Sequence, residues 1–341
     1  MGAKFRNDYS ESAHKKILEA LISINNEQNV GYGLDNHSKK AEEYILNKFN
    51  CKNGEVFFLT GGTQANMVVL SFLLKPYEGV ICCDTGHINV HETAAVEGSG
   101  HKVIVCNNEN GKLTASNIKK TFKKYTDEHM VKPKVVYISN STETGSIYSK
   151  NELLEIRKVC DDLGLFLFMD GARLAVALTC KENDVEPSLL GKVCDVFYVG
   201  GTKNGFLSGE AIVFNNKKLC ENFRYHIKNK GAMLAKGFVV AVQFERAFKD
   251  NLYFDISKST NETAEYIRCG LNNIVTFTSN SPTNQIFIKL DKDKADKVIK
   301  EFSCELWEDL GTEKVIRIVT SFATTKEDCD QLINYIKDIC K

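Results

Sequence analysis

From about residue 55 onward, short apolar runs of strand length alternate with stretches in which apolar residues recur at helical spacing. This alternation is typical of a mainly parallel sheet that is covered by helices on both faces. The predicted strands cover 56–59, 80–84, 103–106, 135–138, 165–169, 196–199 and 209–214, and the predicted helices cover 37–49, 67–74, 116–127, 150–163 and 217–250. The pattern therefore predicts an α/β fold with a mainly parallel sheet flanked by helices.

The two ends of the chain follow other patterns. Residues 5–24 begin as a polar extended arm and continue with apolar residues at helical spacing, which predicts one amphipathic helix. After residue 255 the pattern predicts helix 257–272, strand 285–290, helix 292–302, strand 315–319 and helix 326–340. We therefore expect an N-terminal arm and helix over 1–24, a large domain over 25–250 and a small α+β C-terminal domain over 251–341.

The composition narrows the class of protein. The 341 residues contain 44 basic and 44 acidic side chains, so the net charge of zero gives no reason to expect a nucleic acid or a membrane surface as partner. The twelve cysteines include no Cys-x-x-Cys pair, which argues against a zinc or redox motif and suits the reduced thiols of an intracellular protein. No apolar leader or membrane-length apolar run occurs. We expect a cytoplasmic protein.

The stretch from Asp195 to Gly205 combines an apolar strand with a glycine-rich loop that carries Lys203. A lysine on the dry side of such a loop would have a pKa below its usual value of about 10.4, and its neutral amine could form a Schiff base. The alternative is an ordinary solvated turn. A second buried strand ends at Asp170, about thirty residues upstream, and adjacent strands would bring Asp170 and Lys203 to the same sheet edge.

Two other loops contain residues that could bind an anion or a metal ion. The sequence Thr60-Gly61-Gly62-Thr63 joins a strand to a helix, where free backbone amides make an anion site, although many glycine loops bind nothing. This loop matches neither the Walker nor the dinucleotide pattern. His87 and His91 stand four residues apart, but no third metal ligand is evident, so we predict no metal site.

The motif Asp170-Gly171-Ala172-Arg173, followed by a strand and Lys203, resembles the pyridoxal-phosphate enzymes of the aspartate-aminotransferase fold. Within them the chain is similar to the low-specificity L-threonine aldolases, a branch of the beta-eliminating lyase group, from Phe5 to Thr320. The resemblance implies a pyridoxal 5'-phosphate cofactor and a small amino-acid substrate. The implied reaction is retro-aldol cleavage of L-threonine, L-allo-threonine and related β-hydroxy-α-amino acids to glycine and an aldehyde. A homodimer or homotetramer with active sites at the subunit interface is also implied.

The resemblance also implies roles for residues around the cofactor. Lys203 would bind the cofactor, Asp170 would pair with the ring nitrogen, and His87 would stack on the ring and transfer a proton, with His91 and Glu92 behind it. The cofactor phosphate would be held by residues of the glycine loop and by a basic residue of the neighbouring subunit, namely Gly62, Thr63, Gln64 and Lys236.

The implied substrate site consists of Arg173 and Arg317 on the carboxylate, with Asn7 where the family usually has serine. Thr142 stands where many threonine aldolases have a histidine, so the resemblance implies no direct imidazole contact to the substrate hydroxyl from this position.

Two alternative functions remain open on this sequence. One is another reaction of the same cofactor, β-elimination or transamination, because the Lys/Asp/Arg set is shared. The other is a catalytically silent α/β protein that binds a small anion. Analysis of the products distinguishes aldol cleavage from another reaction of the cofactor. A visible absorbance spectrum distinguishes an enzyme that carries the cofactor from a silent anion-binding protein.

Overall fold

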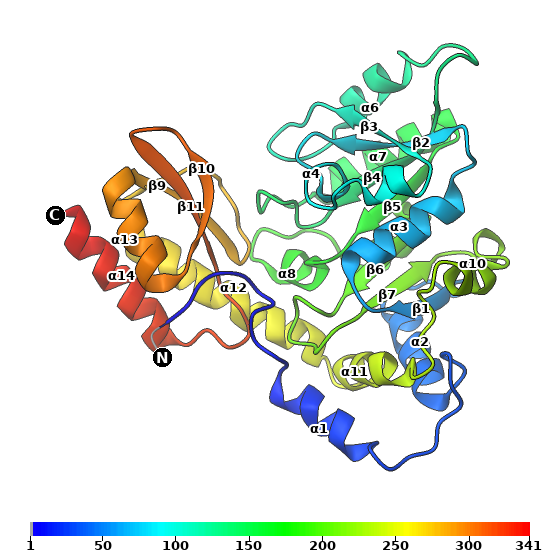
Figure 1. The fold of residues 1–341 in the computed structure, drawn as a ribbon, viewed down its shortest axis with the longest axis horizontal. Helices are drawn as coiled ribbons and strands as arrows, with labels where there is room; N and C mark the ends of the chain where they lie inside the picture. Colours follow the sequence, from blue (N-terminus) through cyan, green and yellow to red (C-terminus); the bar gives the residue numbers. More distant parts are fainter. Residues whose placement is uncertain (1–2) are drawn as a thin grey trace.

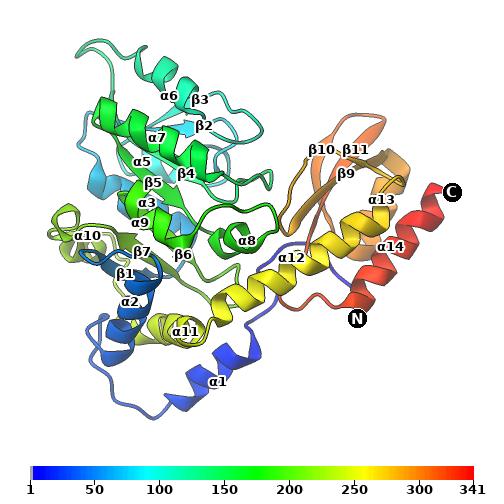
Figure 2. The ribbon, with the colours of Figure 1, turned by 180° about the vertical axis from the view of Figure 1, so that it is seen from behind.

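The computed structural model describes residues 3–341 and contains a large and a small domain joined by one long helix (Figure 1). The helix is α12 (Leu252–Leu271), which begins beside the large domain and ends in the small one (Figure 2). Among residues 3–341, none of the helices combines the length and apolar character needed to cross a bilayer.

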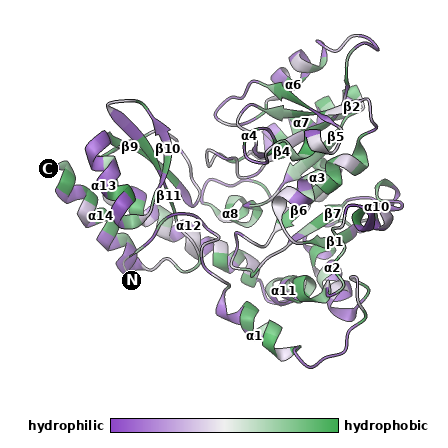
Figure 3. Cartoon of the chain, viewed as in Figure 1, coloured by the Kyte–Doolittle hydropathy of each residue, from purple (hydrophilic) through white to green (hydrophobic). Residues whose placement is uncertain are grey.

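The large domain is built on a seven-stranded sheet in the order β1-β7-β6-β5-β4-β2-β3. Its strands are β1 (Glu55–Leu59), β2 (Glu78–Cys83), β3 (Lys102–Cys106), β4 (Lys132–Ser139), β5 (Phe166–Asp170), β6 (Val196–Gly200) and β7 (Glu210–Phe214). Only β7 runs antiparallel to its neighbours, because a short loop returns it directly from β6. Figure 3 shows the sheet strands as largely hydrophobic, as burial on both faces requires. The predicted mainly parallel α/β fold is confirmed.

Helices cover both faces of this sheet. One face packs against α3 (Gly62–Leu73), α4 (His87–Val90), α5 (Ala95–Gly98) and α10 (Phe223–Asn229). The other face packs against α2 (Asn36–Lys48), α6 (Ala115–Phe122), α7 (Lys150–Leu163), α8 (Leu174–Thr179), α9 (Pro187–Val193) and α11 (Phe238–Lys249).

The prediction of one helical segment over 217–250 is wrong. A 3₁₀ turn (Lys217–Leu219) precedes α10, and a loop separates α10 from α11. The helix α10 ends at Asn229, and Gly231 just beyond it has a φ of 69°, in the left-handed region that commonly ends a helix.

The small domain is a four-stranded antiparallel sheet with helices packed against one face. Its strand order is β10-β11-β9-β8, with β8 (Thr276–Phe277), β9 (Gln285–Asp291), β10 (Glu305–Asp309) and β11 (Glu313–Val319). The helices α12, α13 (Lys292–Phe302) and α14 (Lys326–Cys340) complete its core. The bounds predicted for α13 and α14 are confirmed. Strand β10 was not predicted, because four of its five residues are exposed and three are acidic.

The N-terminal arm connects the two domains a second time, ahead of α1 (Lys15–Ser23). The backbone of Phe5 donates to Phe302 O at 2.9 Å and accepts from Val319 N at 3.1 Å, so the arm lies on the small-domain core. Further on, His14 N donates to Gly205 O at 2.8 Å in the large domain. The arm therefore passes between the domains beside the loop of Lys203.

Candidate active site

The carboxyl ends of β5 and β6 meet at one edge of the large sheet. The two strands are parallel neighbours, so the end of β5 brings Asp170 next to the loop that carries Lys203. Both residues line a cavity of about 260 Å³ whose walls also include Tyr9, Gly61, Gly62, Thr63, His87, Ala172, Tyr198, Thr202 and Glu210. The expectation that Asp170 and Lys203 share a sheet edge is confirmed. We call this cavity the lysine chamber.

Asp170 is held as a carboxylate by a complete set of donors. Tyr198 Oη and Ala172 N donate to Oδ1 at 2.5 and 3.0 Å, and Tyr137 Oη and Asn66 Nδ2 donate to Oδ2 at 2.5 and 3.0 Å. Burial alone would raise the pKa of Asp170. The charge of His87 and the two tyrosine hydroxyls outweigh burial and lower this pKa below its ordinary value. A buried, charged acid is therefore available to a cationic group in the chamber.

Lys203 sits in a loop that other segments hold rigidly. Asn204 donates from Nδ2 to Tyr253 O at 2.7 Å and accepts from Ser257 Oγ at 2.6 Å, which ties the loop to α12. Burial and the neighbouring Arg173 charge lower the pKa of Lys203. The amine is thereby shifted toward its neutral, nucleophilic form.

His87 is fixed at both its ring and its backbone. Its Nδ1 lies 2.7 Å from Glu92 Oε1, and its N–H donates to Glu143 Oε1 at 3.0 Å. Asn66 Nδ2 also donates to Glu92 Oε1 at 2.7 Å, so the histidine network reaches Asp170. The His91 ring lies 5.5 Å from the His87 ring, centroid to centroid. Asn66 and Glu143 were not found from the sequence, and neither carries a local motif that would reveal it.

The glycine loop supplies backbone donors at the chamber. Gly61 caps the N-terminus of α3 without a side-chain hydrogen bond, so the first amides of the helix are open to an anion. Gly61, Gly62 and Thr63 line the chamber. The Gln64 side chain turns back instead and accepts from Thr60 N and Oγ1 at 3.2 and 2.9 Å.

Arg173 is already paired with a carboxylate of the N-terminal arm. Its Nε and Nη2 donate to Asp8 Oδ2 and Oδ1 at 2.7 and 2.9 Å, and Asn284 Nδ2 donates to Asp8 Oδ2 at 2.9 Å. Burial would raise the pKa of Asp8, but the Arg173 and Lys203 charges outweigh it, and this pKa is lowered. To bind the substrate carboxylate as predicted, Arg173 would therefore have to share its guanidinium between the substrate and Asp8.

Arg317 lies on β11 with 9% of its surface exposed. It donates to Gln285 Oε1 at 3.2 Å and to Glu305, and its guanidinium carbon lies 5.2 Å from the Trp307 ring centroid. Within residues 3–341 its buried Nε has no hydrogen-bond partner. Burial and the Arg173 charge lower the pKa of Arg317.

Six predicted site residues do not line the lysine chamber: Gln64, Arg173, Arg317, Thr142, Lys236 and Asn7. Thr142 is buried, and its hydroxyl accepts from Ser146 N at 3.0 Å. Lys236 is exposed, and the adjoining Ala235 O accepts from Tyr32 N at 3.0 Å. Asn7 Oδ1 accepts from the N–H of Tyr9 at 3.1 Å within the arm.

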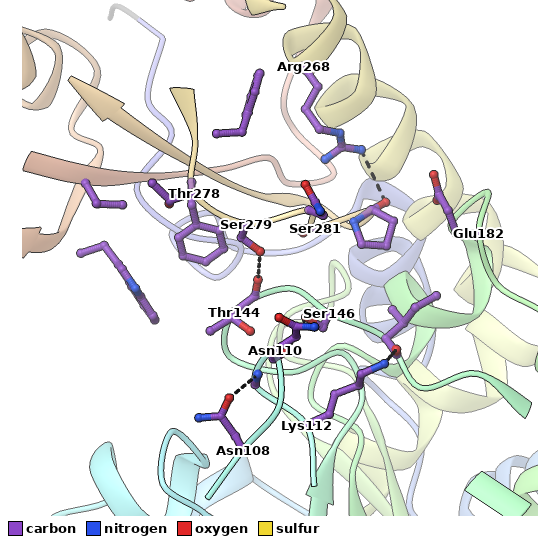
Figure 4. A pocket seen from close by; sticks show the side chains of 18 of the residues that line it. Asn108, Asn110, Lys112, Thr144, Ser146, Glu182, Arg268, Thr278, Ser279 and Ser281 are labelled. Carbon is purple, nitrogen blue, oxygen red and sulfur yellow. Dashed lines mark hydrogen bonds between the residues drawn. The ribbon is translucent and has the colours of Figure 1, made fainter. Parts of the chain in front are cut away.

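A larger cleft of about 1040 Å³ separates the two domains (Figure 4). Ser279 Oγ crosses it to donate to Thr144 O at 2.8 Å. Its basic side chains are already engaged, Lys112 with Glu152 and Arg268 with Thr283 O. The cleft therefore marks the domain boundary. Across residues 3–341, no group of three or more His, Cys, Asp or Glu side chains is arranged to hold a metal ion.

Comparison with known proteins agrees with this geometry. Residues 5–293 match the family model described as beta-eliminating lyase. A low specificity L-threonine aldolase of Pseudomonas sp. (strain NCIMB 10558) is 34% identical over 268 residues, 77% of each chain. The enzyme of that name from Saccharomyces cerevisiae is 24% identical over 302 residues, which are 85% of this chain and 75% of the yeast protein. The solved structure of Leishmania major threonine aldolase superposes with a TM-score of 0.97 at 38% identity, covering 99% of this chain and all of that one.

Proposed function

The chain belongs to the beta-eliminating lyase family, and from this premise we propose that it is a pyridoxal-phosphate-dependent aldehyde-lyase of the threonine aldolase type. It cleaves L-threonine, L-allo-threonine and related β-hydroxy-α-amino acids to glycine and an aldehyde. The observation that carries this proposal is the lysine chamber, in which Lys203, Asp170 and His87 line one cavity.

The chamber fits pyridoxal phosphate. When bound, this cofactor supplies an electron-accepting ring to the α-carbon of the amino acid. The amides of Gly62 and Thr63 at the start of α3 would hold its phosphate. Lys203 would provide the amine that binds it, and the buried Asp170, whose pKa is lowered, would hold a proton at the ring nitrogen.

His87 is the candidate base for the β-hydroxyl proton. Glu92 Oε1 faces His87 Nδ1 at 2.7 Å, so a neutral His87 ring with its proton on Nδ1 would have Nε2 free to accept a proton. Glu143 fixes the backbone at the same residue. A proton of the β-hydroxyl can then pass to Nε2, directly or through water, as the bond between Cα and Cβ breaks.

The substrate carboxylate would bind at Arg317, because its buried Nε has an open donor and its position is fixed by Gln285 and Glu305. Arg173 would also bind the substrate carboxylate, through the guanidinium that Asp8 orients. Asn7 lies next to Asp8 on the N-terminal arm. Thr142 would act on the substrate only after its loop opens, because its hydroxyl is bonded to the Ser146 backbone.

We further propose a homodimer or homotetramer located in the cytoplasm. Several large apolar side chains are exposed near the exposed Lys236, on the loop before α2 and the loop before α11: Val30, Tyr32, Leu34 and Leu234. Such a patch suits a subunit interface, and Lys236 would then reach the neighbouring chamber. Ten of the twelve cysteines are buried as free thiols, which suits a reducing compartment.

The test is the absorbance spectrum and the products of the purified protein. The wild type should absorb visible light through the cofactor bound at Lys203 and release equal amounts of acetaldehyde and glycine from L-threonine. Lys203→Ala should remain folded but lose both the absorbance and the cleavage. Release of ammonia and a keto acid would show a different reaction of the cofactor, and a colourless wild type would contradict the proposal.

A further inference from the structure

Two tyrosines line the lysine chamber, and they lie at different depths. Tyr198 has 1% of its surface exposed and donates to Asp170 at 2.5 Å. Tyr9, on the N-terminal arm, has 51% of its surface exposed. Tyr9 therefore lies at the mouth of the chamber. The reaction described above gives it no role, and sequence analysis did not single it out.

The arm fixes Tyr9 at this mouth through its backbone. The N–H of Tyr9 donates to Asn7 Oδ1 at 3.1 Å, and Ser10 Oγ donates to the same oxygen at 2.8 Å, so the Asn7 side chain closes a turn around Tyr9. The residue before Tyr9 is the buried Asp8, which accepts from Arg173 Nε and Nη2 at 2.7 and 2.9 Å. Both residues that precede Tyr9 are thus anchored, and the half-exposed ring extends from a held backbone.

The Tyr9 ring faces the reactive amine of the chamber. Lys203 Nζ lies 5.7 Å from the centroid of the ring, within the range in which a cation is attracted to an aromatic face. The carboxylate of an amino acid would bind at Arg317 and Arg173, and Arg173 is held by Asp8, next to Tyr9. An amino acid that extends from Lys203 to these guanidinium groups would therefore pass beside the Tyr9 ring.

We propose that Tyr9 is a substrate-binding residue whose aromatic ring covers the amino acid at the mouth of the lysine chamber, a role that rests on the proposed function because it requires the amino acid to bind between Lys203 and the two arginines. Contact with the ring removes apolar surface of both partners from water. The ring covers the α-carbon end that all α-amino acids share, whereas the β-hydroxyl faces His87. Tyr9 therefore strengthens binding without distinguishing the two configurations at Cβ.

The first test reads the exposure of the ring rather than activity. The full-length holoenzyme is treated with tetranitromethane, with and without saturating glycine, and nitrated tyrosines are located by peptide mass spectrometry. Tyr9 should be nitrated in the absence of glycine and largely protected in its presence. The internal control is Tyr266 on α12, which is 39% exposed and has Lys326 Nζ 5.3 Å from its ring centroid. Tyr266 does not line the chamber, and its nitration should be the same in both samples.

The outcomes of this test separate the inference from the proposed function. A visible absorbance that changes on addition of glycine shows that the cofactor and the amino acid are bound. If it changes while Tyr9 is nitrated as fast as without glycine, the covering role is overturned. A Tyr9 that resists nitration without glycine would also overturn it, because the ring would not be at an open mouth. A holoenzyme without cofactor absorbance would overturn the proposed function, and the role of Tyr9 with it.

The second test separates the ring from the hydroxyl. Tyr9→Ala should raise the dissociation constant of glycine, measured by absorbance titration, by about tenfold, the value of one good aromatic contact. Tyr9→Phe keeps the ring and should lose much less affinity. The ratio of kcat/KM for L-threonine and L-allo-threonine should be the same in Tyr9→Ala and the wild type. The matched control Tyr266→Ala should bind glycine as the wild type does.

Two results would contradict the role of the ring. One is a Tyr9→Ala protein that binds glycine as tightly as Tyr266→Ala. The other is a Tyr9→Phe protein as impaired as Tyr9→Ala, which would assign the effect to the hydroxyl. Thermal unfolding of each variant checks that it is folded, as expected for the truncation of a half-exposed side chain.

Discussion

Replacing Asp8 with Asn should destabilise the protein more than any exposed charge substitution. The Asp8 side chain has no exposed surface and pairs with Arg173, of which 9% of the side chain is exposed. Removing one partner of a buried ion pair costs roughly 3–5 kcal/mol, because the other charge remains buried without compensation. With about 2.1 cal/mol/K of unfolding entropy per residue, the 341-residue chain should lose about 4–7 °C in Tm.

The assay is thermal unfolding by calorimetry at pH 7, with Glu19→Gln as control. Glu19 pairs with Lys15 at 3.8 Å, but 59% and 87% of these side chains are exposed, so the control should leave Tm nearly unchanged. The pKa of Asp8 is lowered in the folded protein, so its stabilising effect exists above the unfolded pKa and is lost as pH falls through the folded pKa. The difference between wild type and Asp8→Asn should therefore shrink on acidification. An Asp8→Asn protein as stable as Glu19→Gln at pH 7 would refute the reasoning.

Three further predictions concern the reaction. Asp170→Asn should bind the cofactor but lose on the order of 10²-fold or more in kcat, because a neutral amide cannot hold the proton at the ring nitrogen; an unchanged kcat would exclude this role. Arg317→Lys should raise KM for L-threonine more than it lowers kcat, because an ammonium cannot reproduce the planar set of donors of a guanidinium that Gln285 helps to position. An unaltered KM would show that the substrate carboxylate does not bind at Arg317. The kcat/KM values for L-threonine and L-allo-threonine should differ by no more than about 10²-fold. Thr142→Val should leave the ratio of these two values unchanged, because the Thr142 hydroxyl is hydrogen-bonded within its own loop. Acetaldehyde release from all four threonine stereoisomers measures this, and absolute rejection of one L isomer, or cleavage of the D isomers, would contradict it.

The centre of the site could be predicted from the sequence because it depends on strand ends. A buried strand followed by Asp170, and the next followed by Lys203, specify two side chains at one edge once the strands are neighbours. The glycine loop before α3 is predictable in the same way, since strand, glycine turn and helix are consecutive in the chain.

The surroundings of these residues could not be predicted, because they depend on contacts between remote segments. Asp8 and Arg173 are 165 positions apart, and no local pattern marks them as partners. Glu210 joins the chamber only when β7 pairs with β6, whereas in the sequence it is one acidic residue at the start of a strand. Thr142 differs from these residues, because the family resemblance already indicated its position in the sequence. Only the structure shows that its hydroxyl is hydrogen-bonded to the Ser146 backbone.

The path of the N-terminal arm has a consequence for the order in which the protein matures during synthesis. Phe5 leaves the ribosome long before its backbone partners, Phe302 and Val319, are made. The large sheet can form while the chain is still growing, but the arm has nothing to pair with until the C-terminal domain emerges. Until then Arg173 lacks its Asp8 counterion. A nascent or truncated chain that ends before β11 should thus have a folded lysine loop without a complete substrate site, which would delay activity until β11 has been made.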